Sequence, residues 1–294
     1  MSGYRTNIPA AVPKVRVRDL PLGSCDTHTH VFGGSIKYPM PYVPNYPVPL
    51  ATPEIHLNML EILGITRSVV VQPTQYGSNV DLLIDALRNS ENRLRGVAAA
   101  RSDTTDEALQ TMQDAGVRGL RFVHAFLPNG KLRPGAIPFD EINLLSSRMN
   151  SFGWSVNVWA QLPNIMENIE TLLKPNLPVV LEHIGMVNVE AGLDDQNFVK
   201  LLSLVREQRI SVKISLCRCS KLPPKYNDLK PFVDALIDAN PNQLLWGSDW
   251  PYIRMIGEEP DAGELLDLMK SWVDGDDDIL EKILVTNPEQ LYGF

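Results

Sequence analysis

The sequence has few cysteines and no long apolar run. Only three cysteines occur in 294 residues, Cys25, Cys217 and Cys219. An odd number without regular spacing excludes a disulfide framework and favours a reducing compartment such as the cytoplasm. No stretch reaches the roughly 18 consecutive apolar residues of a membrane-spanning helix, and the N-terminus lacks the apolar core of a secretory signal. We therefore expect a cytoplasmic protein that does not associate with membranes.

Basic residues are also in deficit. Lys and Arg number 27 against 35 Asp and Glu, a formal net charge of −8 at pH 7. Nucleic acids and anionic membranes are bound largely through basic surfaces, so neither is expected as a partner. A small anionic ligand remains compatible, because a few arginines can dominate the potential inside a cleft. A Gly-rich phosphate turn is missing too, which argues against a doubly wound, dinucleotide-binding sheet.

Short β-branched runs alternate with amphipathic stretches from residue 24 onward. Eight such β-then-α units in a chain of this length predict an α/β fold, a (β/α)8 TIM-like barrel formed as one domain over residues 1–294. Residues 1–23 are predicted to be an irregular N-terminal lead-in, and the proline-rich residues 33–53 a functional loop. The predicted strands are Cys25–Val31, Ser68–Gln72, Gly96–Ala100, Gly119–Phe122, Ser155–Trp159, Val179–His183, Ser211–Leu216 and Leu244–Asp249. The predicted helices are Pro53–Leu63, Asn79–Ser90, Thr105–Ala115, Phe139–Phe152, Pro163–Leu173, Asp195–Glu207, Leu229–Ala239 and a tail from Glu259.

Residues capable of catalysis lie at the C-terminal ends of three predicted strands. Asp26, His28 and His30 alternate along the first strand, so they are expected to share one face, the barrel interior near its mouth. Two imidazoles on one interior face are costly without partners, which favours a site over a pair of structural histidines. His183 and Asp249 end two later strands. The alternatives for them are a structural histidine and a capping or loop carboxylate.

Four segments together resemble the amidohydrolase superfamily, in its amidohydrolase 2 branch, over roughly residues 24–294. They are DTHTHVF at 26–32, VLEHIG at 180–185, WGSDWP at 246–251 and TNPEQLY at 286–292. The similarity is to the lactonases that act on pyrone dicarboxylates, muconolactones and sugar-acid lactones. It implies a hydrolase that opens the ester bond of a small carboxylated lactone in aromatic or sugar acid catabolism. His28, His30 and His183 would polarise the carbonyl, and Asp249 would take a proton from the attacking water.

The same four side chains are also a reasonable ligand set for zinc. His28, His30, His183 and Asp249 could hold one ion, which would lower the pKa of a bound water towards neutrality. The resemblance implies that the pyrone lactonases need no metal, whereas other branches of the superfamily use one. A binuclear site is not expected, because the strand around Arg121 offers no bridging Lys or Glu. The predicted cofactor is therefore none, or one divalent metal.

Several side chains are predicted to bind the substrate. Arg121 ends an apolar strand and matches a carboxylate-binding arginine of the resembled lactonases; its alternative is a salt bridge across the barrel. Gln72 ends its strand and is expected to face the pocket, and the remaining residues match or lie close to substrate contacts in those enzymes. These are Tyr46, Trp159, Arg218, Lys131 and Arg133. Arg218, Lys131 and Arg133 are out of register, so the pattern favours an anionic lactone without specifying a pyrone.

Two other reactions and one non-catalytic role stay open. Zinc-dependent decarboxylases on similar barrels usually have a further histidine on a later strand, and residues 212–216 contain none. A sugar-acid lactone isomerase is not separable from a hydrolase by sequence. A barrel that only binds a carboxylate is disfavoured, because it leaves four convergent titratable groups unexplained. Cys217 and Cys219, one residue apart, are interpreted as incidental thiols, and the oligomeric state is left open.

Overall fold

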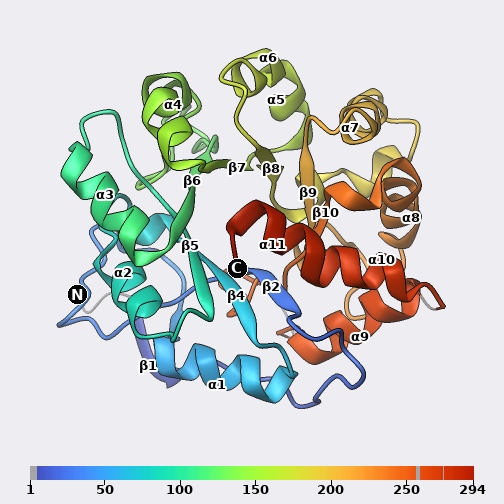
Figure 1. The fold of residues 1–294 in the computed structure, drawn as a ribbon, viewed down its shortest axis with the longest axis horizontal. Coiled ribbons are helices and arrows are strands. Elements are labelled where there is room, and N and C mark those ends of the chain that lie inside the picture. The colour runs from blue at the N-terminus through green and yellow to red at the C-terminus, as the bar shows by residue number, and fades with distance from the viewer. Residues whose placement is uncertain (1–4, 256–258, 274) are drawn as a thin grey trace.

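Eight parallel strands form a nearly closed barrel in the computed structural model, which describes residues 5–255, 259–273 and 275–294. Helices surround the strands on the outside (Figure 1). This arrangement confirms the predicted (β/α)8 fold. In spatial order the strands are β2 (Cys25–Thr29), β4 (Arg67–Val71), β5 (Leu94–Ala98), β6 (Val117–Val123), β7 (Ser155–Trp159), β8 (Val179–Leu181), β9 (Ser211–Ile214) and β10 (Leu244–Trp246).

The outer helices follow the predicted amphipathic stretches with two differences. The stretch predicted as one helix from Pro163 is two short helices broken at Asn168, whose amide donates to the Asn164 carbonyl oxygen at 2.8 Å. The described part of the stretch from Glu259 contains three α-helices, and a π-helical segment (Lys282–Thr286) joins the second directly to the third. The helices are α1 (Pro53–Leu63), α2 (Asp81–Arg88), α3 (Asp106–Ala115), α4 (Asp140–Phe152), α5 (Leu162–Glu167), α6 (Ile169–Leu173), α7 (Gln196–Arg206), α8 (Lys230–Ala239), α9 (Ala262–Trp272), α10 (Asp277–Glu281) and α11 (Asn287–Tyr292). Among the described residues, no helix combines the length and apolar character needed to cross a membrane.

Six of the eight strands end before the residue predicted from their apolar patterns, and the three that carry the candidate catalytic residues are among them. Strand β2 ends at Thr29, β8 at Leu181 and β10 at Trp246. The chain turns at these points, so His30, His183 and Asp249 lie in the loops just beyond the strands, whereas His28 stays in β2. In a parallel barrel these loops form the mouth at the C-terminal ends of the strands.

Part of the N-terminal segment is regular, which corrects the prediction of an irregular lead-in. Strand β1 (Arg5–Pro9) pairs in parallel with β3 (Val48–Leu50), which belongs to the proline-rich loop. Neither segment has an alternating apolar pattern. The pairing depends on two segments far apart in the chain, so local periodicity does not reveal it.

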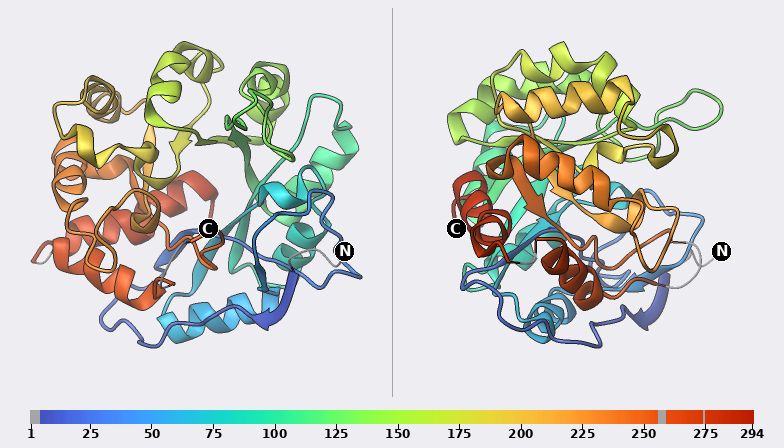
Figure 2. Two further views of the ribbon diagram at one scale, coloured as in Figure 1. Left: turned by 180° about the vertical axis from the view of Figure 1, so that it is seen from behind. Right: turned by 90° about the vertical axis from the view of Figure 1, so that its right-hand side faces the viewer.

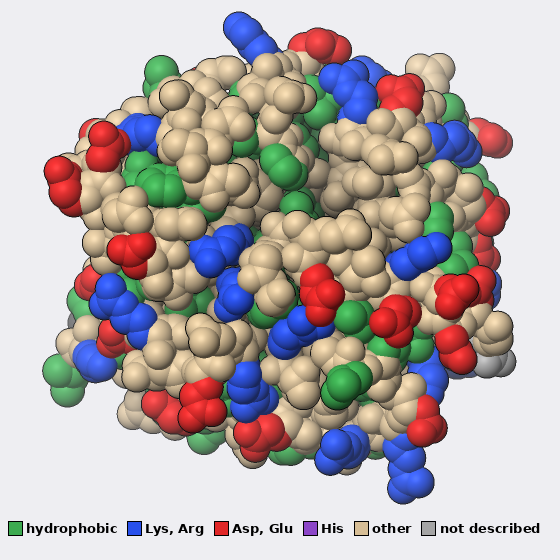
Figure 3. All heavy atoms as spheres, in the orientation of Figure 1, with side chains coloured by type: hydrophobic (Ala, Val, Ile, Leu, Met, Phe, Trp, Pro, Cys, Tyr) green, Lys and Arg blue, Asp and Glu red, His purple; other side chains and the backbone are tan. Residues whose placement is uncertain are grey.

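The two ends of the barrel are closed by different parts of the chain. Helix α11 covers the N-terminal ends of the strands, and the buried side chain of Tyr292 enters an apolar cluster with Val69, Val97 and Leu245 inside the barrel. The Tyr292 hydroxyl donates to Asn157 Oδ1 at 3.2 Å. The long loops lie at the opposite end (Figure 2, right). Because α11 and Tyr292 close the N-terminal end, the end with the long loops is the open end of the barrel. On the face that α11 covers, acidic and basic side chains are interspersed (Figure 3).

The barrel closes along a seam between β2 and the segment that follows β10. The backbone N–H of Asp249 donates to the His28 carbonyl oxygen at 2.8 Å, and the N–H of His30 donates to the Trp250 carbonyl oxygen at 2.9 Å. The Thr27 hydroxyl donates to the Trp246 carbonyl oxygen at 2.7 Å. The two backbones are so close at Gly247 that a Cβ there would lie 2.5 Å from His28 Cβ and 2.9 Å from its backbone nitrogen. The seam therefore requires glycine at position 247.

We expect Gly247→Ala to lower the free energy of unfolding by about 1–3 kcal/mol, because its methyl group would overlap a backbone that cannot move without opening the seam. Chemical denaturation with far-UV circular dichroism measures the change. Gly34→Ala is the matched control, since a Cβ at Gly34 meets no atom within 4 Å. Equal denaturation midpoints for the two variants would contradict the close approach.

Candidate active site

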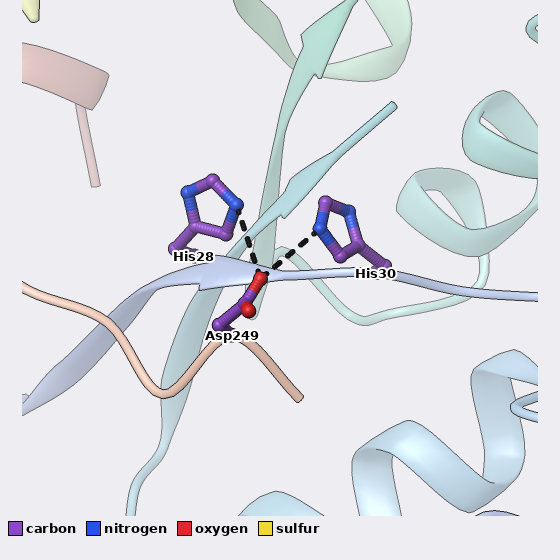
Figure 4. Close-up of side chains that lie close together, drawn as sticks. All are labelled: His28, His30 and Asp249. Carbon is purple, nitrogen blue, oxygen red and sulfur yellow. Dashed lines mark ion pairs between the residues drawn. The ribbon is translucent and has the colours of Figure 1, made fainter. Parts of the chain in front are cut away.

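Three imidazoles and one carboxylate meet at the mouth of the barrel. Asp249 Oδ1 lies 3.4 Å from His30 Nε2 and 3.7 Å from His28 Nε2 (Figure 4). The ring of His183 is 4.6 Å from that of His28, and the His28 and His30 rings are 5.0 Å apart, centroid to centroid. All four side chains are buried. The structure thus brings together the four residues that the sequence singles out.

The position of Asp26 differs from the expected alternation. The register between β2 and β4 shifts by one residue between Asp26 and Thr29, and Cys25 packs in the apolar cluster inside the barrel. A β-bulge of this kind interrupts the two-residue period. Asp26 Oδ1 instead accepts the backbone N–H groups of His28 at 3.1 Å and Ser248 at 3.0 Å. Asp26 therefore fastens the seam on which His28 and Asp249 depend.

Two of the four site residues have strained backbones. His183 has a φ of +52° and Asp249 a φ of +67°, in the left-handed region that side chains with a Cβ rarely adopt. Ile184, next to His183, has a φ of +55° although it is β-branched. Such conformations cost on the order of 1–3 kcal/mol each and persist only where surrounding contacts hold them. The strain turns both side chains back towards the centre of the mouth.

The His30 and Asp249 side chains leave room for a cation between them. His30 Nδ1 lies 2.7 Å from the Val71 carbonyl oxygen, and because a carbonyl only accepts, Nδ1 must carry the proton. A neutral ring then presents the Nε2 lone pair to Asp249 Oδ1. Neither ring nitrogen of His28 has a hydrogen-bond partner among the described residues. Two ligand atoms of a tetrahedral zinc ion are separated by about 3.4 Å. The distances among His28, His30 and Asp249 therefore fit a single divalent ion. A hydrogen bond between His30 Nε2 and Asp249 Oδ1 would fit the 3.4 Å distance equally well.

A second carboxylate, Glu182, lies directly below the histidines. It accepts from Arg121 Nε at 3.1 Å and Nη2 at 2.7 Å, and its Oε1 is 4.0 Å from His28 Nδ1. Burial acts to raise the pKa of Glu182, but the charges of Arg121 and Lys213 outweigh it and lower the pKa. Burial lowers the pKa of Lys213 to about 8. The strand-end motif around His183 contains Glu182, but only the fold places Arg121 and Lys213 beside it.

Arg218 is the ion-pair partner of Asp249. Its Nε donates to Asp249 Oδ2, and its Nη1 donates to the Ile253 carbonyl oxygen at 2.8 Å. Burial acts to raise the pKa of Asp249, but Arg218, His183 and His30 hold it well below its usual range. Asp249 is therefore ionised at neutral pH. Because Arg218 occupies Oδ2, the oxygen available for chemistry is Oδ1.

A cavity of about 340 Å³ opens above these residues. It is lined by His30, His183 and Asp249 from the group of four, and His28 lies beneath them. Of the predicted substrate residues, five line the cavity: Tyr46, Arg121, Arg133, Trp159 and Arg218.

Two predicted substrate residues do not line the cavity. The Gln72 amide donates to the carbonyl oxygens of Gly77 at 3.1 Å and Asn79 at 2.6 Å, so it anchors the following loop. Lys131 is exposed at a turn between Phe126 and Leu132, which pair as an isolated bridge. The prediction for Gln72 rests on its position at a strand end, and that for Lys131 on its place near a substrate contact in a loop of the resembled lactonases. Neither signal gives the direction of the side chain.

The sequence interpretation missed Arg254, which lines the cavity in the loop after β10. Its guanidinium lies 5.6 Å from the centre of the Tyr46 ring, and the Tyr46 hydroxyl accepts from the Gln75 amide. Burial, followed by repulsion from Arg133, lowers the pKa of Arg254. Neither Arg133 nor Arg254 forms an ion pair within the described part of the chain. Arg121 and Arg218 are neutralised by carboxylates, so among the described residues Arg133 and Arg254 are the two arginines of the cavity without a carboxylate partner.

We expect the imidazoles of His28 and His183 to be neutral at pH 7. Burial lowers the pKa of both groups, that of His183 to about 4. The folded state therefore resists protonation, and stability is lost as the pH falls from 6.5, the value in the unfolded chain, towards 4. Side-chain 15N shifts of histidine-labelled protein measure this directly, with His183→Gln assigning the signal. An imidazolium signal from either residue at pH 7 would disprove the assignment.

Comparison with known proteins agrees with the geometry. The chain is 32% identical over 284 residues to a 2-pyrone-4,6-dicarboxylate hydrolase of Comamonas testosteroni, covering 93% of this chain and 91% of that protein. It is 31% identical over 278 residues to a 4-sulfomuconolactone hydrolase of Hydrogenophaga intermedia, covering 93% and 90%. The probable 2-pyrone-4,6-dicarboxylic acid hydrolase of Acinetobacter baumannii, solved with citric acid bound, superposes with a TM-score of 0.75 at 26% identity, over 93% of this chain and 100% of that one. The Amidohydrolase family model matches residues 25–294, and the chain belongs to that family.

Proposed function

We propose that the protein hydrolyses the ester bond of a small carboxylated lactone. The observation that supports this most directly is the placement of an ionised carboxylate and three imidazoles at the floor of a cavity. The walls of this cavity hold two arginines that have no carboxylate partner within the part of the chain that the structure describes. Its relatives include hydrolases of 2-pyrone-4,6-dicarboxylate and of 4-sulfomuconolactone. Both names describe lactones with anionic substituents.

Asp249 would act as the general base in this reaction. Its Oδ1 faces the cavity beside His30, while Oδ2 is held by Arg218. A water between Oδ1 and the substrate would lose a proton to Asp249 as its oxygen bonds to the ester carbonyl carbon. When the ring C–O bond breaks, that proton passes to the departing oxygen. The products are a carboxylic acid and a hydroxyl or enol on the same opened chain.

The imidazoles would stabilise the charge that develops on the carbonyl oxygen. His30 and His183 both line the cavity. The Nδ1 of His183 has no hydrogen-bond partner among the described residues, so a ring N–H of His183 would be the direct donor to the carbonyl oxygen. The Nδ1 proton of His30 is bound to the Val71 carbonyl oxygen, so His30 would act through its position beside Asp249. His28 is buried between Asp249 and Glu182 and would act from below. Fixed donors in a site of low polarity stabilise an oxyanion more than water does, because they need no reorganisation.

Arginines would hold the anionic groups of the substrate. Arg133 and Arg254 have no carboxylate partner among the described residues, and Arg121 keeps N–H groups beyond those bound to Glu182 and Gln72. Arginine presents paired N–H groups that match a carboxylate or a sulfonate. The Tyr46 and Trp159 rings line the same cavity and would pack against a flat lactone ring.

A single divalent ion is compatible with this proposal. His28, His30 and Asp249 would hold it, with His183 beside them, and it would lower the pKa of a bound water. Metal analysis of the purified protein, and activity before and after chelator treatment, decide between the metal-free and metal-containing forms. The assignment of the arginines holds in both forms. Asp249 Oδ1 would be the general base in the metal-free form and a ligand of the ion in the metal-containing form.

A panel of lactones tests the reaction and the substrate class together. We expect acid release, followed with a pH indicator, from lactones bearing carboxylate or sulfonate groups. Asp249→Asn should reduce kcat by about 100- to 10,000-fold, because the general base is lost. Its far-UV circular dichroism should stay that of the folded protein, although loss of the ion pair with Arg218 lowers the melting temperature. Acid release by Asp249→Asn at near-normal rates would remove Asp249 as the base. A lactone that is consumed without acid release, with an isomeric lactone as product by NMR, would indicate an isomerase instead.

Arg254→Gln is expected to raise KM about 10- to 100-fold for a lactone with two anionic groups, because a charge-assisted hydrogen bond in a buried site is lost. The change in kcat should stay within about threefold, since Arg254 is not at the reacting atoms. Arg133→Gln should behave likewise. Lys131→Gln is the matched control, as it removes a positive charge from the same loop as Arg133 but outside the cavity. An equal effect of Lys131→Gln would show that only the overall charge matters.

A further inference from the structure

The tripeptide Cys217-Arg218-Cys219 lies between the two loops that present His183 and Asp249. It follows β9, and β9 is hydrogen-bonded to β8 on one side and β10 on the other. His183 follows β8, and Asp249 follows β10. The tripeptide therefore belongs to the loop whose strand, β9, lies between the strands that lead into His183 and Asp249.

All three residues of this segment contact the neighbouring loops. The Cys219 thiol lies 3.1 Å from the His183 carbonyl oxygen. The Cys217 thiol lies 3.6 Å from Asp249 Oδ2 and 3.9 Å from the Ser248 carbonyl oxygen. Arg218 Nε donates to the same Asp249 oxygen. One segment thus reaches the backbone that carries His183 and the carboxylate of Asp249.

Both contacted residues need support, because both have positive φ angles. A non-glycine residue in this region relaxes towards negative φ unless neighbouring groups oppose the change. Relaxation at His183 would move its ring, and relaxation at Asp249 would move Oδ1 away from His30. Contacts at the His183 carbonyl and at Asp249 Oδ2 oppose both movements and leave Oδ1 directed at the histidines.

The two thiols are suited to this role because both are buried and each faces an oxygen of a neighbouring loop. A thiol S–H is a weak hydrogen-bond donor, so each thiol can donate to the oxygen that it faces. These contacts offer an alternative to the interpretation of Cys217 and Cys219 as incidental thiols.

We propose that Cys217 and Cys219 are positioning residues that hold Asp249 and His183 in their reactive conformations. This inference rests on the proposed roles of Asp249 and His183. Neither thiol lines the active-site cavity, so in this role neither supplies a proton or a nucleophile. The thiols change the fraction of molecules in which Asp249 and His183 are correctly placed. Loss of a thiol should therefore lower kcat more than it raises KM.

The test compares alanine and serine at each position, using the anionic lactone that the wild-type protein turns over fastest. Cys217→Ala and Cys219→Ala should each lower kcat about tenfold and leave KM within about twofold. Cys217→Ser and Cys219→Ser, which keep a donor of similar size, should stay within about threefold of wild type. Cys25→Ala is the matched control, since Cys25 is equally buried but lies in the apolar cluster inside the barrel. It should leave both constants unchanged.

A readout that needs no substrate separates this inference from the proposed function. In histidine-labelled protein, Cys217→Ala should shift the 15N signals of His30, and Cys219→Ala those of His183, while Cys25→Ala shifts neither. If no lactone is hydrolysed but these shifts occur, the proposed reaction fails and the positioning role stands. The positioning role is overturned if the alanine variants keep the wild-type shifts, if their kcat stays within twofold, or if Cys25→Ala causes the same loss.

Discussion

The close approach of β2 to the segment after β10 is the constraint on which the site depends. These strands are the first and last of the barrel, and their backbones meet where Gly247 lies against His28. Hydrogen bonds from Asp249 to the His28 carbonyl and from His30 to the Trp250 carbonyl hold the seam. Because His28, His30 and Asp249 lie on the seam itself, closing the barrel and assembling the reactive group are the same event.

Two carboxylates at the mouth are each paired with an arginine, and two further arginines there have no such partner among the described residues. Glu182 is matched by Arg121, and Asp249 is matched by Arg218. Burying a charge without a partner is costly, so such pairing is what a stable interior needs. Arg133 and Arg254 break this rule within the described residues, and they do so at the wall of the cavity. An anionic ligand would supply the missing partners, which connects the electrostatics of the free protein to the choice of substrate.

Strain and support are distributed over three adjacent loops. His183 and Asp249 adopt left-handed backbone conformations, and the segment between them contacts both. A reactive group built from loops can be placed accurately only if the loops hold one another, since each alone is free to relax. The packing of the β9 loop against its neighbours therefore belongs to the functional design as much as the residues that would meet the substrate.

The eight strands and the four central site residues could be predicted because their signals are local. Apolar runs of four to seven residues mark the strands, and a polar residue that ends such a run marks the mouth of a barrel, as for His183 and Asp249. The same reasoning misplaced Gln72 and Lys131, because being at the mouth does not determine where a side chain points. It also missed the shifted register at Asp26, since a β-bulge depends on the neighbouring strand.

The sequence by itself determined the order of strands and helices and the chemical groups available at the strand ends. The tertiary structure decided which of those groups have partners. Arg254 became prominent only when it was found without a carboxylate, and Cys217 and Cys219 only when their thiols were found against Asp249 and His183. Periodicity is encoded within a few neighbouring residues, whereas charge compensation and support of a strained backbone arise between loops that are distant in the chain and meet only in the closed barrel.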